Sequence, residues 1–97
     1  MLNSRQRAQL RALANPLPCI FQIGKGGLND NMLKQISIAL ENRELVKIHL
    51  LENSDCDLRE TCQRVCEILH ADPVQVIGSK FIIYRESKDN KTIELVK

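Results

Sequence analysis

Residues 23–30 read IGKGGLND, and this stretch places three glycines between a short apolar run and a helix start. Glycine has no Cβ and weakens the interior of a helix or a strand, so the backbone must change its structure here. The preceding residues 19–23, CIFQI, are apolar and bounded by proline and glycine, which predicts a strand. Asn29 can cap a helix that follows. The stretch therefore predicts a strand–turn–helix unit early in the chain.

Helix and strand signals alternate along the rest of the chain. Residues 5–15, RQRAQLRALAN, have helical spacing, and we expect Ser4 as their N-cap and Leu10 and Leu13 on one face. Two further amphipathic segments predict a helix from Asn29 to about Arg43 and another after Asp55 or Asp57. The expected core positions on these two helices are Leu33, Ile36 and Leu40, then Leu58, Cys62, Val65, Cys66 and Leu69.

Strand signals separate these helices. Residues 44–51, ELVKIHLL, alternate apolar and polar side chains, and residues 74–77 and 80–86 flank Gly78-Ser79, a two-residue hairpin signal. The predicted order is a helix followed by β-α-β-α-β-β. This order predicts an α/β domain with a small mixed four-stranded sheet packed with helices, in two or three layers.

Composition limits the class of protein. The 97 residues suit one domain, and 43% hydrophobic with 27% charged residues is ordinary for a folded protein. No apolar stretch approaches the roughly 18 residues that a membrane span needs. The N-terminal residues contain three arginines and no apolar core of a secretory signal. We therefore expect a cytoplasmic protein with reduced thiols and no membrane partner.

Charge is unevenly distributed along the chain. Residues 1–29 carry four basic residues and no acidic ones, whereas residues 30–72 have a net charge of −4 and residues 73–97 a net charge of +2. If the two ends meet in space, they form a basic face that attracts polyanions. The alternative is a solvated surface of mixed charge.

The glycine segment matches several phosphate-binding motifs in part. Its spacing excludes a Walker A loop, and a dinucleotide fingerprint fails because Asn29 stands where the third glycine belongs. A G-x-x-G turn at Gly24–Gly27 remains, and its exposed amides and Lys25 can contact a phosphate closely. KH domains use such a loop, but there it joins two helices. The alternative is a plain strand-to-helix turn without a ligand.

Three stretches together resemble a known family. GKGGL before a helix, the ELVKI strand and VQVIG-x-x-FIIYR near the end occur in the order and spacing of the CRM domain (chloroplast RNA splicing and ribosome maturation). The resemblance covers residues 3–86 and is strongest to the stand-alone bacterial proteins of the YhbY type. It implies a fold like the C-terminal domain of translation initiation factor 3. Residues 87–97 form a tail to which it assigns no role.

The resemblance also implies a function. It implies non-catalytic binding of ribosomal RNA, or of precursors of the large ribosomal subunit, during ribosome assembly. The residues implied in RNA binding are Gly24, Lys25, Gly26 and Gly27 of the loop and the neighbouring bases Arg7, Arg11, Lys47, Lys80 and Arg85.

Other side chains have competing interpretations. Cys62 and Cys66 are four apart on an apolar stripe without a C-x-x-C motif, so we expect buried structural thiols and no metal. His49 and Tyr84 could contact RNA, although packing roles compete. We find no catalytic constellation, and we expect no cofactor, no small-molecule substrate and a monomer.

The alternative function is a protein-interaction module that docks on a ribosomal protein or an assembly factor. Its surface would be the acidic middle of the chain, with Glu52, Asp55, Asp57 and Glu60.

Overall fold

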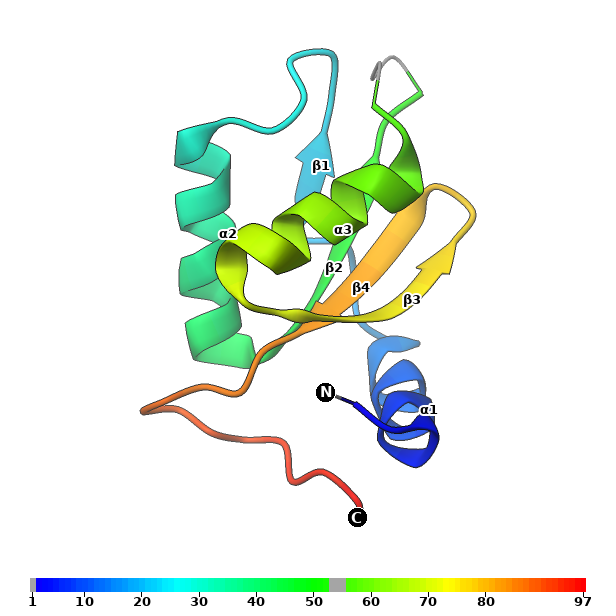
Figure 1. Ribbon diagram of the computed structural model, residues 1–97, viewed down its shortest axis with the longest axis vertical. Coiled ribbons are helices and arrows are strands. Elements are labelled where there is room, and N and C mark those ends of the chain that lie inside the picture. Colours follow the sequence, from blue (N-terminus) through cyan, green and yellow to red (C-terminus); the bar gives the residue numbers. More distant parts are fainter. Residues whose placement is uncertain (1, 53–55) are drawn as a thin grey trace.

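A computed structural model describes residues 2–52 and 56–97, in which three helices surround a four-stranded sheet (Figure 1). The order of these elements is the predicted one, and the α/β class with a mixed sheet is confirmed. The elements are α1 (Ser4–Ala14), β1 (Phe21–Ile23), α2 (Asp30–Arg43), β2 (Leu45–Leu50), α3 (Leu58–Leu69), β3 (Asp72–Ile77) and β4 (Lys80–Tyr84).

The sheet has the strand order β1-β2-β4-β3. β1 and β2 are parallel, as a strand–helix–strand unit requires, whereas β4 is antiparallel to both of its neighbours. The predicted hairpin joins β3 to β4, and Gly78 takes a φ of 60°, which suits a tight two-residue turn. Helices cover both faces of the sheet, α2 and α3 on one side and α1 on the other, so the fold has three layers (Figure 1).

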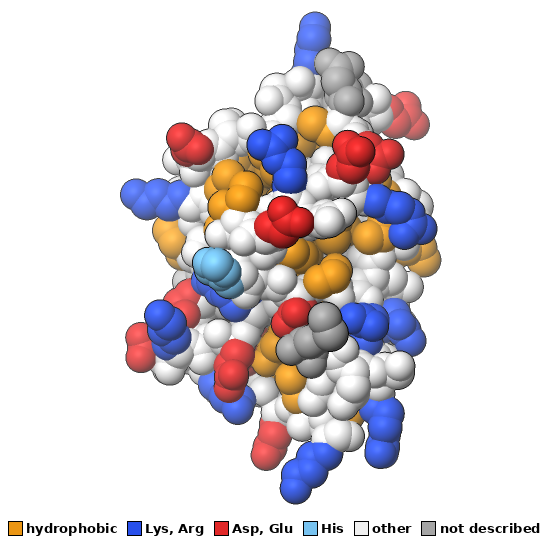
Figure 2. Space-filling view, in the orientation of Figure 1, with side chains coloured by type: hydrophobic (Ala, Val, Ile, Leu, Met, Phe, Trp, Pro, Cys, Tyr) orange, Lys and Arg blue, Asp and Glu red, His pale blue; other side chains and the backbone are white. Residues whose placement is uncertain are grey.

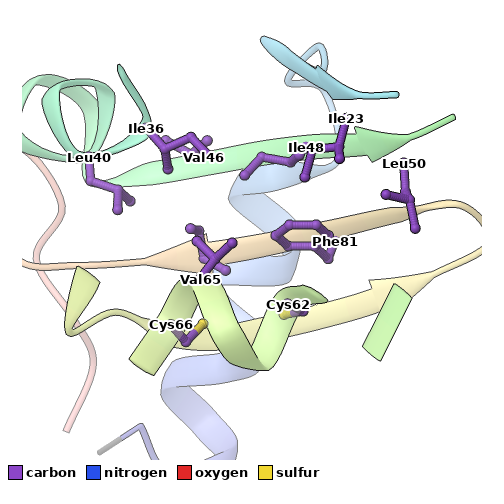
Figure 3. Close-up of a cluster of buried hydrophobic side chains, with 11 residues drawn as sticks. Ile23, Ile36, Leu40, Val46, Ile48, Leu50, Cys62, Val65, Cys66 and Phe81 are labelled. Atoms are coloured by element: carbon purple, nitrogen blue, oxygen red, sulfur yellow. The ribbon is translucent and has the colours of Figure 1, made fainter. Parts of the chain in front are cut away.

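The larger core lies between the sheet and the helices α2 and α3 (Figure 3). Alternate residues of β2 and β4 point to this side, including Ile48 and Phe81, which are fully buried. Ile36 and Leu40 of α2 and Val65 of α3 pack against them, as their helical spacing predicts. The stripe on α3 extends through Cys62 and Cys66, both of which are buried.

The smaller core lies on the α1 side of the sheet. Leu10 and Ala14 are fully buried against β2, β3 and β4, whereas Leu13 is 44% exposed, so the two leucines predicted to share one face of the helix differ in burial. The buried positions are four apart, which is closer to the helical repeat than the predicted pair. The N-cap of α1 is Asn3 and not Ser4, because Asn3 and Gln6 form a reciprocal capping box.

Residues 87–97 pack on the smaller core. Ile93 and Leu95 contact it, and Gln6 and Gln9 of α1 hydrogen-bond the tail backbone near its end. Glu44 is completely buried, and its carboxylate accepts hydrogen bonds from the backbone amides of Ser87, Thr92 and Ile93. Ser87, Lys88 and Asp89 also donate hydrogen bonds to the Glu41 carboxylate. The tail to which the resemblance assigns no role is therefore held by two carboxylates and by α1.

None of the helices that the structure describes has the length and apolar character needed to span a bilayer.

Candidate functional site

The glycine segment forms a tight turn at the end of β1. The Gly27 amide donates a hydrogen bond of 2.9 Å to the Gly24 carbonyl, and Gly27 has a φ of 65°. A Cβ at Gly27 would lie 3.1 Å from the Cys56 Sγ, whereas a Cβ at Gly26 would meet nothing within 4 Å. Lys25, which lies between Gly24 and Gly26, is exposed. The fold thus favours glycine at position 27, while Gly26 leaves the backbone open to an approaching group.

A helix begins directly after this turn. The Asn29 side chain accepts a hydrogen bond of 2.8 Å from the Met32 amide, which confirms Asn29 as the N-cap of α2. Leu28 is half-buried and packs on the larger core, so it anchors the turn. The positive end of the α2 dipole therefore faces the region of the turn, and this end favours an anion such as phosphate.

The turn and the β3–β4 hairpin lie at the same end of the sheet (Figure 1). The Leu51 amide donates to the Ile23 carbonyl at the end of β1, and the Leu50 amide donates to the Ser79 carbonyl in the hairpin, both at 2.8 Å. These bonds fix the two loops relative to β2. They bring two exposed lysines that are far apart in sequence, Lys25 and Lys80, to one end of the sheet.

A further basic side chain, that of Lys47 in β2, lies on the α1 side of the sheet. Val46 and Ile48 belong to the larger core, so Lys47 and His49, which alternate with them, lie on the α1 side. Both are half-buried, and His49 pairs with Lys80 across the strands. The Lys47 ammonium lies 3.5 Å from the carbonyl of Asn15, the residue after α1, and Arg11 is exposed in the last turn of that helix.

Two of the arginines that the resemblance implies in RNA binding, Arg7 and Arg85, lie away from these lysines. Arg7 is half-buried, and its Nε donates a hydrogen bond of 3.4 Å to the Pro73 carbonyl, at the opposite end of the sheet from the hairpin. The Arg85 guanidinium donates to the carbonyls of Ser37 at 2.7 Å and Leu69 at 3.1 Å, between α2 and α3. The structure does not bring Arg85 to the other bases, because its guanidinium is bound between α2 and α3.

Two further side chains, those of Tyr84 and Cys66, are buried in the two cores. Tyr84 is 4% exposed in the smaller core, where burial and the nearby Glu44 raise its pKa to about 12. A hydrogen bond with Cys62, together with burial, raises the pKa of the Cys66 thiol. Within residues 2–52 and 56–97, no three side chains of the metal-binding types come together in a site.

The acidic middle of the chain does not form a separate acidic surface among the described residues. Asp57 caps α3 and accepts a hydrogen bond of 3.0 Å from the Glu60 amide, and Asp55 lies outside the described residues. Figure 2 shows acidic and basic side chains interspersed over the face that carries α3. Glu52 and Glu60 are exposed and stay candidates for a protein contact.

The fold and the turn define a class of protein, a small α/β domain with a G-x-x-G turn between a strand and a capped helix. The family model of the CRS1/YhbY (CRM) domain matches residues 2–85, and the chain belongs to this family. Membership confirms the resemblance seen in the sequence. The likeness to the C-terminal domain of initiation factor 3 stays a prediction.

Relatives match over nearly their whole length. A Bacillus subtilis protein named "Probable RNA-binding protein YqeI" is 46% identical over 95 residues, which are 98% of this chain and 99% of the relative. A Haemophilus influenzae "RNA-binding protein" is 32% identical, covering 93% of this chain and 91% of that one. The solution structure of the hypothetical protein SAV1595 from Staphylococcus aureus matches with a TM-score of 0.82 and 53% identity, covering 99% of this chain and 100% of that one.

Proposed function

We propose that the protein binds RNA without catalysis, with the Gly24–Gly27 turn gripping the phosphate backbone. The observation that carries this proposal is the geometry of the turn. Its backbone is open at Gly26, Lys25 is exposed beside it, and the capped N-terminus of α2 follows. Backbone amides and a lysine near a helix N-terminus favour a phosphate over a neutral ligand.

The basic surface next to the turn extends this grip. Lys80, Lys47 and Arg11 lie on the end and the α1 side of the sheet, and we include them with Lys25 in one RNA-binding surface. Two relatives carry names that describe RNA-binding proteins, which supports RNA as the polyanion. Ribosomal RNA in precursors of the large ribosomal subunit is the RNA that we propose.

The test is the substitution Gly26→Asp. It places a carboxylate where the phosphate should lie, in a position with no protein atom nearby, so the fold should persist. We expect affinity for a single-stranded oligoribonucleotide to fall by about tenfold or more, equivalent to about 1.4 kcal/mol. Gln35→Glu, which adds the same charge at an exposed position of α2, is the matched control and should change affinity little.

Circular dichroism and thermal melting would establish that both variants are folded. Undiminished RNA affinity in folded Gly26→Asp would refute the turn as the grip. In cells, Gly26→Asp should no longer sediment together with large-subunit precursors. Co-purification with a ribosomal protein that survives nuclease treatment would instead favour the protein-interaction module.

A further inference from the structure

The α1 side of the sheet has a hollow beyond the end of α1. Its volume is about 350 Å³, and its floor includes Ile82, which is 2% exposed. Lys47, which pairs with Ile82 across the strands, lies beside this floor. The remaining lining residues are Asn15, Gln75, Ile77, Gly78, Ser79 and Lys80. We call this cavity the α1-side hollow.

Two contacts hold the walls of the α1-side hollow. On one side, the carbonyl of Asn15 lies 3.5 Å from the Lys47 ammonium, which ties the end of α1 to β2. On the other side, the β3–β4 hairpin is fixed to β2 by the hydrogen bond between Leu50 and Ser79. A hollow with such walls is formed before any ligand arrives.

The charge of the hollow favours an anionic occupant. Two lysines and no carboxylate line it, whereas four other hollows of the described surface each include at least one carboxylate. Lys80 also lies at the same end of the sheet as the Gly24–Gly27 turn. A phosphate backbone gripped by the turn would therefore meet the lysines of the hollow next.

The interior of the hollow has the chemistry of a base-binding site. Ile77 is 56% exposed, and its apolar surface would be covered by a flat, largely apolar ring. The half-buried Gln75 and the exposed Asn15 bring amide groups that both donate and accept hydrogen bonds, as the edges of nucleobases do. Proteins read single-stranded RNA by such contacts with bases that are splayed out of their stack.

We propose that the α1-side hollow holds one unstacked base of the bound single-stranded RNA. In this arrangement Lys47 and Lys80 contact the flanking phosphates, Ile77 and Ile82 cover the ring, and Gln75 contacts its edge. The proposal rests on the proposed function, and it adds a site for the base to a turn that recognises only the backbone. It gives the protein a means of preferring one base over another.

The test compares a decauridine strand with a decamer of the same backbone that lacks bases. The wild-type protein should bind the abasic strand about five- to tenfold more weakly, which is the low end of the loss for a base stacked on an aromatic ring, because the hollow is lined by isoleucines instead. Gln75→Leu, which keeps the side-chain size and removes the amide, should reduce this difference to about twofold or less. Gln35→Leu, the same change on the exposed surface of α2, should leave it unchanged.

Methyl NMR locates the contact. Uridine 5′-monophosphate should shift the methyl signals of Ile77 and Ile82, and ribose 5-phosphate should shift them much less. Equal binding of the decauridine and abasic strands by the wild type, with Gly26→Asp still weakening both, would refute the base site and leave the backbone grip intact. Failure of the wild type to bind either strand would refute the proposed function as well.

Discussion

Replacing Glu44 by alanine tests the structural role of the buried carboxylate. Glu44 is fully buried, and three backbone amides of the tail donate to it at distances of 2.7 to 2.8 Å. Burial by itself would raise its pKa, but the hydrogen bonds from Ser87, Ile93 and Thr92 outweigh burial and lower it. The carboxylate is therefore charged in the folded protein and holds the tail against the end of α2.

The expected loss in the free energy of unfolding follows from these three hydrogen bonds. A hydrogen bond to a charged group contributes about 1.5 to 3 kcal/mol, so three of them set an upper limit of about 5 to 9 kcal/mol. Thr92 is exposed and Ile93 half-buried, so water can replace the acceptor at these two amides, while Ser87 is buried. We therefore expect Glu44→Ala to lower the free energy of unfolding by about 3 kcal/mol, with a drop in Tm of about 4 to 8 °C per kcal/mol.

A second substitution separates the side chain from the backbone. Glu44 has a φ of 66°, a conformation that costs a residue with a Cβ about 1 kcal/mol or more. Glu44→Gly loses the same carboxylate but relieves this cost, so it should be about 1 kcal/mol less destabilised than Glu44→Ala. Glu94→Ala, at an exposed tail residue whose carbonyl alone makes a hydrogen bond, is the control and should change stability by less than about 0.5 kcal/mol.

The assays are urea unfolding and amide hydrogen exchange. In Glu44→Ala the amides of Ser87, Thr92 and Ile93 should exchange much faster than the amides of β2 and β4. A loss of less than about 1 kcal/mol, or unchanged protection of these three amides, would contradict the reasoning.

Three further predictions concern the loop, the sheet surface and pH. Gly27→Ala should lower the free energy of unfolding by about 1 to 2 kcal/mol, because φ is positive and Cys56 is close, whereas Gly26→Ala should melt like the wild type. Lys47→Ala should reduce the slope of log affinity against log salt concentration by about 0.7, the value for one phosphate contact with a single strand. An unchanged slope would show that Lys47 does not belong to the RNA-binding surface. Hydrogen bonds from the Ser87 side chain and from the Asp89 and Lys88 backbone lower the pKa of Glu41, and hydrogen bonds from the tail lower the pKa of Glu44. The stability that these two carboxylates contribute should therefore be fully present above their ordinary pKa of 4.5 and be lost as pH drops below it. Acid titration of unfolding in the wild type and in Glu44→Ala checks this, since the variant should lose part of the dependence.

The sequence was a good guide wherever one local signal decided the structure. Asn29 and Asp57 both cap the helices predicted to follow them, and Gly78 turns the predicted hairpin. The apolar stripe on α3 packs on the core as its spacing indicated. These features depend on side chains within a few residues of each other, so nearby residues carry the information.

Local signals failed where distant segments decide. On α1, Leu10 and Ala14 are buried and Leu13 is not, because the buried face is the one that packs on strands and a tail far along the chain. The partners of the buried Glu44 carboxylate come from a tail more than forty residues further along the chain. Arg85 is one of the basic residues that the resemblance implies in RNA binding, and in the sequence it resembles a surface charge. In the structure, carbonyls of α2 and α3 bind its guanidinium.

The sequence by itself determined the order of the elements, the glycine turn with its helix cap and the membership in a family. These follow from periodicity, turn residues and motif spacing, which are properties of neighbouring residues. Only the tertiary structure decided which of the bases share a surface, that the tail closes the smaller core, and that a hollow with lysines and amides lies beyond α1. Pairing of β2 with β4 and the placement of α1 create that hollow, and both depend on contacts between residues far apart in the chain.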